Sequence, residues 1–120
     1  MNAGTPRVFI TQESDRFDYG QAEHFGEVVF LTAKEVSPIH GSLINATILE
    51  EMSRKLATFD FDKDFLTPSG SPVVTGIAFF MLGKRVASEP ALRNAVLSVL
   101  RWSNRDRVYQ PVPLAVGGPL

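Results

Sequence analysis

The segment from Asp64 to Leu82 constrains the fold more than any other part of the chain. It starts as an extended stretch, passes through Gly70-Ser71-Pro72 and then runs to Leu82 with almost no polar side chain. Serine at an N-cap followed by proline is typical of a helix start, because the N–H that proline lacks has no partner there anyway. We therefore predict a strand, a tight turn and a helix that is apolar all round, which must be covered on several flanks.

Length and composition fit one domain over residues 1–120, with residues 1–6 and 115–120 expected to be flexible. The chain has no cysteine, which excludes a disulfide framework and a thiol nucleophile and suits a reducing cytoplasm. Its start lacks both a basic region and an apolar core, so we expect no secretory signal. The longest apolar run, Ile77 to Leu82, is too short to cross a bilayer. We therefore expect a cytoplasmic protein without a membrane partner.

The first half of the chain alternates strands and helices. Arg7 to Gln12 is β-branched enough for a strand, and the unbroken apolar run within Gly26 to Thr32 indicates a second strand buried on both faces, hence central in a sheet. An amphipathic helix follows from about Leu43 to Phe59, and Glu50 and Glu51 each precede a cation by four residues. From Phe59 to Phe65 phenylalanines alternate with aspartates, which predicts a strand-like entry with the three rings on one side.

The second half ends in a predicted β-hairpin. The apolar helix should end near Gly83-Lys84-Arg85, where cations meet the negative end of its dipole. Residues 95–102 and 107–114 then form two strands around the turn Ser103 to Asp106. Pro111 and Pro113 have the same parity, so the last strand belongs at a sheet edge. The fold class is α/β, or α+β if both helices lie on one face: a mixed sheet of about five strands, two main helices and a C-terminal hairpin.

Positive charge gathers in the last third of the chain, although the formal net charge is only −1. Cations for phosphate and aromatic rings for bases are the combination that single-stranded nucleic-acid grooves use. The candidate nucleic-acid-binding residues are Lys84, Arg85, Arg101, Trp102, Arg105, Arg107 and Tyr109. The alternative is that Trp102 completes a core face while the arginines decorate a solvated turn.

Other chemistry has weaker support. The N–H groups at the start of the apolar helix, at Gly70 and Ser71, are a candidate anion-binding site for a nucleotide or phosphate ligand. Asp60-x-Asp62-x-Asp64 resembles the start of a calcium loop, but Phe65 stands where such a loop needs glycine, so we assign no metal. His24 and His40 have no nameable catalytic partners, and we expect neither an enzyme nor a cofactor.

The apolar helix also suggests self-association. Because no stretch of it offers a polar face, we expect Phe79, Phe80 or Met81 to be covered by a second copy, giving a homo-oligomer such as a homodimer.

The order of segments resembles a family of small proteins encoded by tailed bacteriophages. The likeness rests on Val8 to Glu13, Phe25 to Leu31, Asp64-Phe-Leu with Gly70-Ser-Pro72, and Leu100-Arg-Trp102 followed by Tyr109 to Val112. Such relatives tend to carry Gly-Asp-Pro where this chain has Gly70-Ser71-Pro72, and because Asp and Ser both cap helices, the difference supports a capping role.

No activity or site residues are carried over from that family. The resemblance implies a viral accessory protein in the host cytoplasm. We expect it to bind a macromolecule without catalysis, most concretely single-stranded nucleic acid. A host or viral protein partner and a minor role in the virion remain open alternatives.

Overall fold

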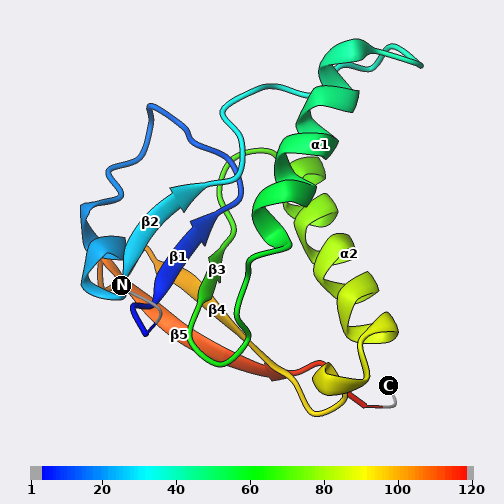
Figure 1. Ribbon diagram of the computed structural model, residues 1–120. Coiled ribbons are helices and arrows are strands. Elements are labelled where there is room, and N and C mark those ends of the chain that lie inside the picture. The colour runs from blue at the N-terminus through cyan, green and yellow to red at the C-terminus, as the bar shows by residue number, and fades with distance from the viewer. Residues whose placement is uncertain (1–3, 119–120) are drawn as a thin grey trace.

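The computed structural model describes residues 4–118, which form one domain with a five-stranded sheet and two helices (Figure 1). The strands are β1 (Arg7–Ile10), β2 (Glu27–Phe30), β3 (Phe65–Thr67), β4 (Val96–Ser103) and β5 (Val108–Ala115). The helices are α1 (Leu43–Leu56) and α2 (Pro72–Ser88), with two short 3-10 turns, η1 (Gly20–His24) and η2 (Pro90–Leu92). The predicted mixed sheet, helix pair and C-terminal hairpin are confirmed.

The sheet order is β2-β1-β3-β4-β5, with parallel pairing up to β4 and an antiparallel β4–β5 hairpin. The connection from β1 to β2 runs toward one edge of the sheet, whereas those from β2 to β3 and from β3 to β4 run toward the other. Connections of one hand therefore place η1 on one face and both helices on the opposite face, as Figure 1 shows. With both helices together on one face, the fold is α+β.

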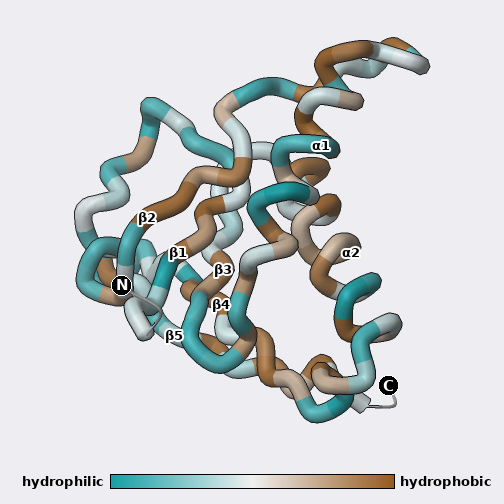
Figure 2. Tube along the Cα trace, in the orientation of Figure 1, coloured by the Kyte–Doolittle hydropathy of each residue, from teal (hydrophilic) through white to brown (hydrophobic). Residues whose placement is uncertain are grey.

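Each face of the sheet has its own apolar cluster, and the tube in Figure 2 shows the strands as the mostly hydrophobic layer between them. On the helix face, Phe9, Leu66 and Leu97 meet the inner sides of α1 and α2. On the η1 face, Val8, Ile10, Leu100 and Ala22 pack together with partly buried aromatic rings. The alternation of strand side chains sorts them between the two clusters.

β2 was predicted to be central, and this prediction is wrong, since β2 is an edge strand paired only with β1. Its apolar run is nevertheless accounted for, because Val28 and Phe30 pack on the η1 face while Val29 packs on the helix face. A strand can be buried on both faces without being central in the sheet, and an apolar run in the sequence indicates only the burial.

The segment Phe59 to Phe65 is a turn followed by a strand, not the continuous strand-like entry that was predicted. Asp64 N donates to Asp60 O at 2.8 Å, which closes one helical turn before β3 begins. As a result Phe59 and Phe61 are buried on the helix face, whereas Phe65 packs on the η1 face. The three rings therefore do not share one side.

α2 begins as predicted and ends later. Ser71 Oγ accepts from Val73 N at 3.1 Å, and Pro72 is the first helical residue. The helix continues through Gly83 and ends at Ser88, just before Pro90. α1 likewise starts at Leu43 but ends at Leu56, three residues before the predicted end.

The last strand lies at a sheet edge, as the two prolines predicted. Pro111 lies opposite Leu100 and Pro113 opposite Ser98. The pairing continues to Ala115, which lies opposite Val96. Val116 and Gly117 both donate to Ala95 O, so the chain just after β5 is bonded to the residue before β4. The remaining residues of the predicted flexible ends, 1–3 and 119–120, lie outside the described residues.

Candidate functional site

In a sheet of this order ligands usually bind in the crevice at the carboxyl ends of β1 and β3. From these two neighbouring strands the connections run toward opposite edges of the sheet. Here the crevice is filled by the protein itself. Thr11 Oγ1 donates to Ser69 O at 2.7 Å and accepts from Ser69 N at 2.8 Å. Gln12, only 3% exposed, donates through Nε2 to Lys34 O at 2.8 Å. These side chains fasten together the loops that follow β1, β2 and β3.

The predicted anion site at Gly70 and Ser71 is occupied by this same glutamine. Gln12 Oε1 accepts the N–H of Ser71 at 2.5 Å, so the donor expected to face an anion is already satisfied. Gly70 has φ +78°, and a Cβ there would lie 2.1 Å from Gln12 Oε1. The strand-to-helix turn therefore holds the loops together, with the Ser71 N–H directed at Gln12.

Beside this closed crevice, on the η1 face, lies an open cleft of about 910 Å³ between the loop after β1 and the end of the β4–β5 hairpin. We call it the hairpin cleft. In Figure 1, η1 and the hairpin turn lie together at the left of the sheet. The cleft is lined by residues 16–19, Gln21, Pro68, Ser69, residues 99–102, Asn104, Arg107 and Tyr109.

Four aromatic side chains line the hairpin cleft, two from each side. On the hairpin, the Trp102 and Tyr109 rings stack edge to face with centroids 4.9 Å apart. On the loop, Phe17 is 54% exposed and lies 6.3 Å from Tyr19. Tyr19 is fixed in turn, because its hydroxyl accepts from Ser14 N at 2.9 Å. The cleft thus combines three positioned rings, Tyr19, Trp102 and Tyr109, with the half-exposed ring of Phe17.

The two sides of the cleft are electrostatically coupled at Tyr109. Burial raises the pKa of the Tyr109 hydroxyl, and the nearby Tyr19 hydroxyl and Asp18 carboxylate raise it further. Tyr109 therefore stays neutral and can donate a hydrogen bond over the whole physiological range.

Three arginines in or near the cleft have no carboxylate partner in the described part of the chain. Arg16 and Arg107 line it, and Arg105 stands beside Arg107 in the exposed turn. None of these three forms an ion pair with any residue between 4 and 118. Arg107 adopts φ 58°, unusual for a residue with a side chain, and its N–H closes the turn onto Ser103 O at 2.7 Å.

The other predicted nucleic-acid residues separate from this group. Arg101 borders the cleft, but strand alternation turns its side chain away from Trp102, and it donates to Gln110 Oε1 at 2.6 Å. Lys84 and Arg85 lie near the C-terminal end of α2, on the opposite sheet face and at the far end from the hairpin turn. Lys84 and Arg85 therefore lie apart from the arginines at the hairpin cleft.

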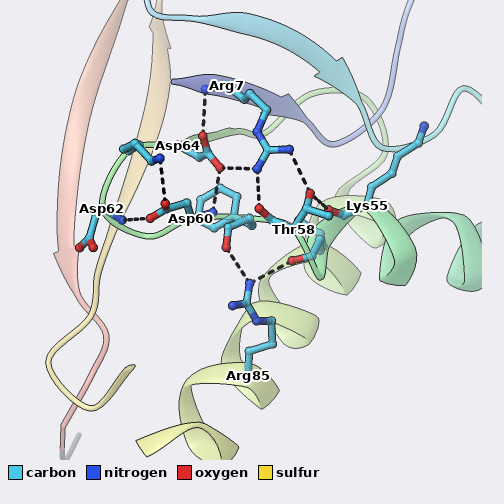
Figure 3. A network of polar contacts seen from close by, with 10 residues as sticks. Arg7, Lys55, Thr58, Asp60, Asp62, Asp64 and Arg85 are labelled. Atoms are coloured by element: carbon cyan, nitrogen blue, oxygen red, sulfur yellow. Dashed lines mark hydrogen bonds and ion pairs between the residues drawn. The ribbon is translucent and has the colours of Figure 1, made fainter. Parts of the chain in front are cut away.

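Arg85 belongs instead to a structural network around the end of α1 (Figure 3). Its Nη1 donates to Leu56 O at 3.0 Å, a carbonyl at the end of α1 that also accepts from Phe59 N at 3.1 Å, and to Phe59 O at 2.8 Å just beyond the helix. Its Nε pairs with Glu89 at 3.0 Å. Arg85 is thus a cap for α1, contributed by α2.

The aspartate triplet lies in the same network and carries out structural roles. Asp64 is 2% exposed and accepts from Arg7 N, Arg7 Nη2 and Asp60 N at 2.8–3.0 Å. Asp60 accepts from the Asp62 N–H, which lowers the pKa of Asp60, and it also pairs with Lys63 at 3.4 Å. Among the residues that the structure describes, no cluster of three potential ligands is arranged for a metal ion.

His24 and His40 are exposed and occupy separate places, the first at the end of η1 and the second in the loop before α1. No hydrogen bond or ion pair joins either imidazole to another described side chain.

The resemblance to phage proteins has an independent basis. A family model described as Phage Pam3 gp32-like protein matches residues 6–116. The chain belongs to this phage protein family. No curated protein and no solved structure matches the chain. Of the helices within residues 4–118, none is long and apolar enough to cross a membrane.

The loop residues Arg16, Phe17 and Tyr19 were not among the candidates selected from sequence. A signal was present, because Arg16-Phe-Asp-Tyr19 repeats the mixture of cations and rings that drew attention to the hairpin. Sequence gave no reason to place the two segments side by side, since 83 positions separate Tyr19 from Trp102 (102 − 19).

Proposed function

We propose that this phage protein binds single-stranded nucleic acid in the hairpin cleft and catalyses no reaction. The observation that carries the proposal is the meeting of two aromatic pairs with unpaired arginines at one cleft. Base stacking on aromatic rings contributes about 1–3 kcal/mol per base, and it needs rings that are exposed yet firmly positioned. Phe17 supplies exposure, while the Trp102–Tyr109 pair supplies a positioned surface.

The arginines supply the complementary electrostatic part. Within residues 4–118, Arg16, Arg105 and Arg107 form no ion pair with a carboxylate, so phosphates would not have to compete with any such pair there. Each phosphate contact on a single strand contributes about −0.7 to the slope of log K against log salt concentration, so three contacts predict a slope of about −2. Binding should therefore weaken markedly between low and physiological salt.

The test is the fluorescence anisotropy of a labelled oligothymidine titrated with the full chain over a salt series. Phe17→Ala should weaken binding roughly 5- to 160-fold through lost stacking. The matched control is Phe80→Ala, which removes an exposed ring on the opposite sheet face and should leave affinity unchanged. Likewise Arg107→Gln should make the salt slope about 0.7 shallower, whereas Arg93→Gln, far from the cleft, should not change it.

Three outcomes would overturn the proposal. The first is absence of salt-sensitive binding by the unmodified protein. The second is an equal effect of each variant and its control, which would place the contact elsewhere. The third is equally tight binding of thymidine monophosphate, which would indicate a small-ligand pocket instead of a groove for a strand.

A further inference from the structure

The outer side of α2 is apolar and uncovered within the described chain. Val74, Ala78 and Leu82 face the core, but Val73 is 57% and Phe80 67% exposed. The sequence led us to expect that the whole stretch to Leu82 is hidden, and within one copy only the inner stripe is. Of the three predicted interface residues, Phe80 points outward, Met81 is half-buried, and Phe79 lines a separate apolar hollow near Leu97.

This face carries both a protrusion and a hollow that fits one. A groove of about 1050 Å³ runs between the outer sides of α1 and α2, bordered by Leu49 and Ser53 on α1 and by Ile77 and Met81 on α2. Phe80 stands at its edge, between Gly76 and Gly83. A Cβ added at either glycine would meet no atom within 4 Å, so both positions leave open surface for a close approach.

We propose that this face, the α1–α2 face, is the interface of a homodimer. A surface that holds a knob beside a groove is complementary to itself, as a two-fold interface requires. With the axis near Phe80 and the two α2 helices antiparallel, residues before Phe80 in one copy face residues after it in the other. Gly76 then lies opposite Gly83 of the second copy, and each Phe80 ring enters the groove of the other.

Charge around the groove fits the same arrangement. Lys84 borders the α2 side and lies over the Phe80 ring at 5.7 Å, with no carboxylate partner among the described residues. Glu50 borders the α1 side, and its only ion pair with a described residue is an exposed one with Arg54 at 3.5 Å. The two-fold brings Lys84 of one copy toward Glu50 of the other. A second copy thus supplies the opposite charge as well as the matching shape.

The size of the face sets the expected strength. Helices of 14 and 17 residues are about 21 and 25 Å long, and side by side they are about 20 Å wide. Their projected face is therefore about 500 Å², below the roughly 600–1,000 Å² per partner that stable complexes bury and in the range of weak, transient ones. We expect a reversible dimer. The hairpin cleft lies on the opposite sheet face, so both clefts stay open in the dimer.

The test is sedimentation equilibrium of the full chain from micromolar to millimolar concentration. The wild-type protein should show a concentration-dependent monomer–dimer equilibrium. Phe80→Asp should remain monomeric throughout, and Phe17→Asp, a matched change at another exposed phenylalanine, should dimerise like the wild type. Gly76→Leu adds a helix-favouring side chain into open space of the monomer, so it should keep the fold by circular dichroism while abolishing dimerisation.

Charge reversal identifies the arrangement. Lys84→Glu and Glu50→Lys should each weaken dimerisation, and the double variant should restore it, because the pair is re-formed with its signs exchanged. A strict monomer at all concentrations, or dimerisation that Phe80→Asp leaves unchanged, would overturn the proposal. Failure of the double variant to recover would refute the antiparallel arrangement that pairs Lys84 of one copy with Glu50 of the other. None of these results bears on oligonucleotide binding, which is measured separately.

Discussion

Replacing Asp64 by asparagine should destabilise the protein strongly, although it changes only one oxygen into an amide nitrogen. The carboxylate is 2% exposed, and its two oxygens accept three hydrogen bonds from Arg7 and Asp60. Oδ2 accepts two of them, and Oδ1 accepts the Arg7 backbone N–H. This carboxylate therefore joins the start of β1 to the turn before β3.

The cost follows from counting donors. An asparagine keeps most contacts by placing its oxygen where Oδ2 lies, which turns its NH₂ group toward the Arg7 backbone N–H. One buried donor then loses its acceptor, at about 1–3 kcal/mol. The Arg7 guanidinium also loses its charged partner, but because this side chain is 30% exposed it regains water, and we add only roughly 1 kcal/mol. The expected total is about 2–4 kcal/mol.

The measurement is urea unfolding followed by the fluorescence of Trp102, the single tryptophan of the chain. Asp62→Asn is the matched control, since the Asp62 side chain is exposed in the same turn, and it should change stability by less than about 0.5 kcal/mol. An unchanged m-value would show that the denatured state is not altered. If Asp64→Asn and Asp62→Asn had equal midpoints, the assignment of Asp64 as a structural anchor would be refuted.

Two further predictions concern Gly70 and Tyr109. Gly70→Ala should destabilise by more than the roughly 1–2 kcal/mol of a left-handed residue, because its Cβ would also displace Gln12; Gly41→Ala, at φ +74° with no atom within 4 Å of the new Cβ, isolates the backbone part in a thermal unfolding assay, and equal losses would contradict the contact. Because burial raises the pKa of Tyr109, its contribution is fully present below the unfolded-state pKa of about 10 and is lost as pH rises through the folded-state pKa. Tyr109→Phe should abolish this alkaline loss in unfolding curves measured up to and beyond that pH, and an unchanged pH profile would disprove the assignment.

Local sequence predicted the features that depend on neighbours along the chain. The predictions of the Ser71 cap, of the start of α2 at Pro72 and of an edge position for the strand with Pro111 and Pro113 were all correct. Each depends only on a capping side chain or on the N–H that a proline lacks, and both act within a few residues. The ion pairs of Glu50 with Arg54 and of Glu51 with Lys55 also followed from helical spacing.

Errors came where one local pattern fits two tertiary arrangements. Any strand with both faces covered needs an apolar run such as that of β2, whether the strand is central or at the edge of the sheet. The alternation from Phe59 to Phe65 suits a strand, yet the buried Asp64 makes a turn more stable by bonding to Arg7 and Asp60.

The sequence by itself determined the identity and order of the elements, the edge position of the hairpin and the presence of cations with aromatic rings near its turn. Only the tertiary structure decided that the loop after β1 meets that hairpin, that Gln12 fills the anion site, and which side of α2 faces outward. The physical reason is that these features depend on pairing β1 with both β2 and β3, segments whose contacts span tens of residues. Such contacts are selected by the packing of the whole sheet and leave no signature in any short stretch of the chain.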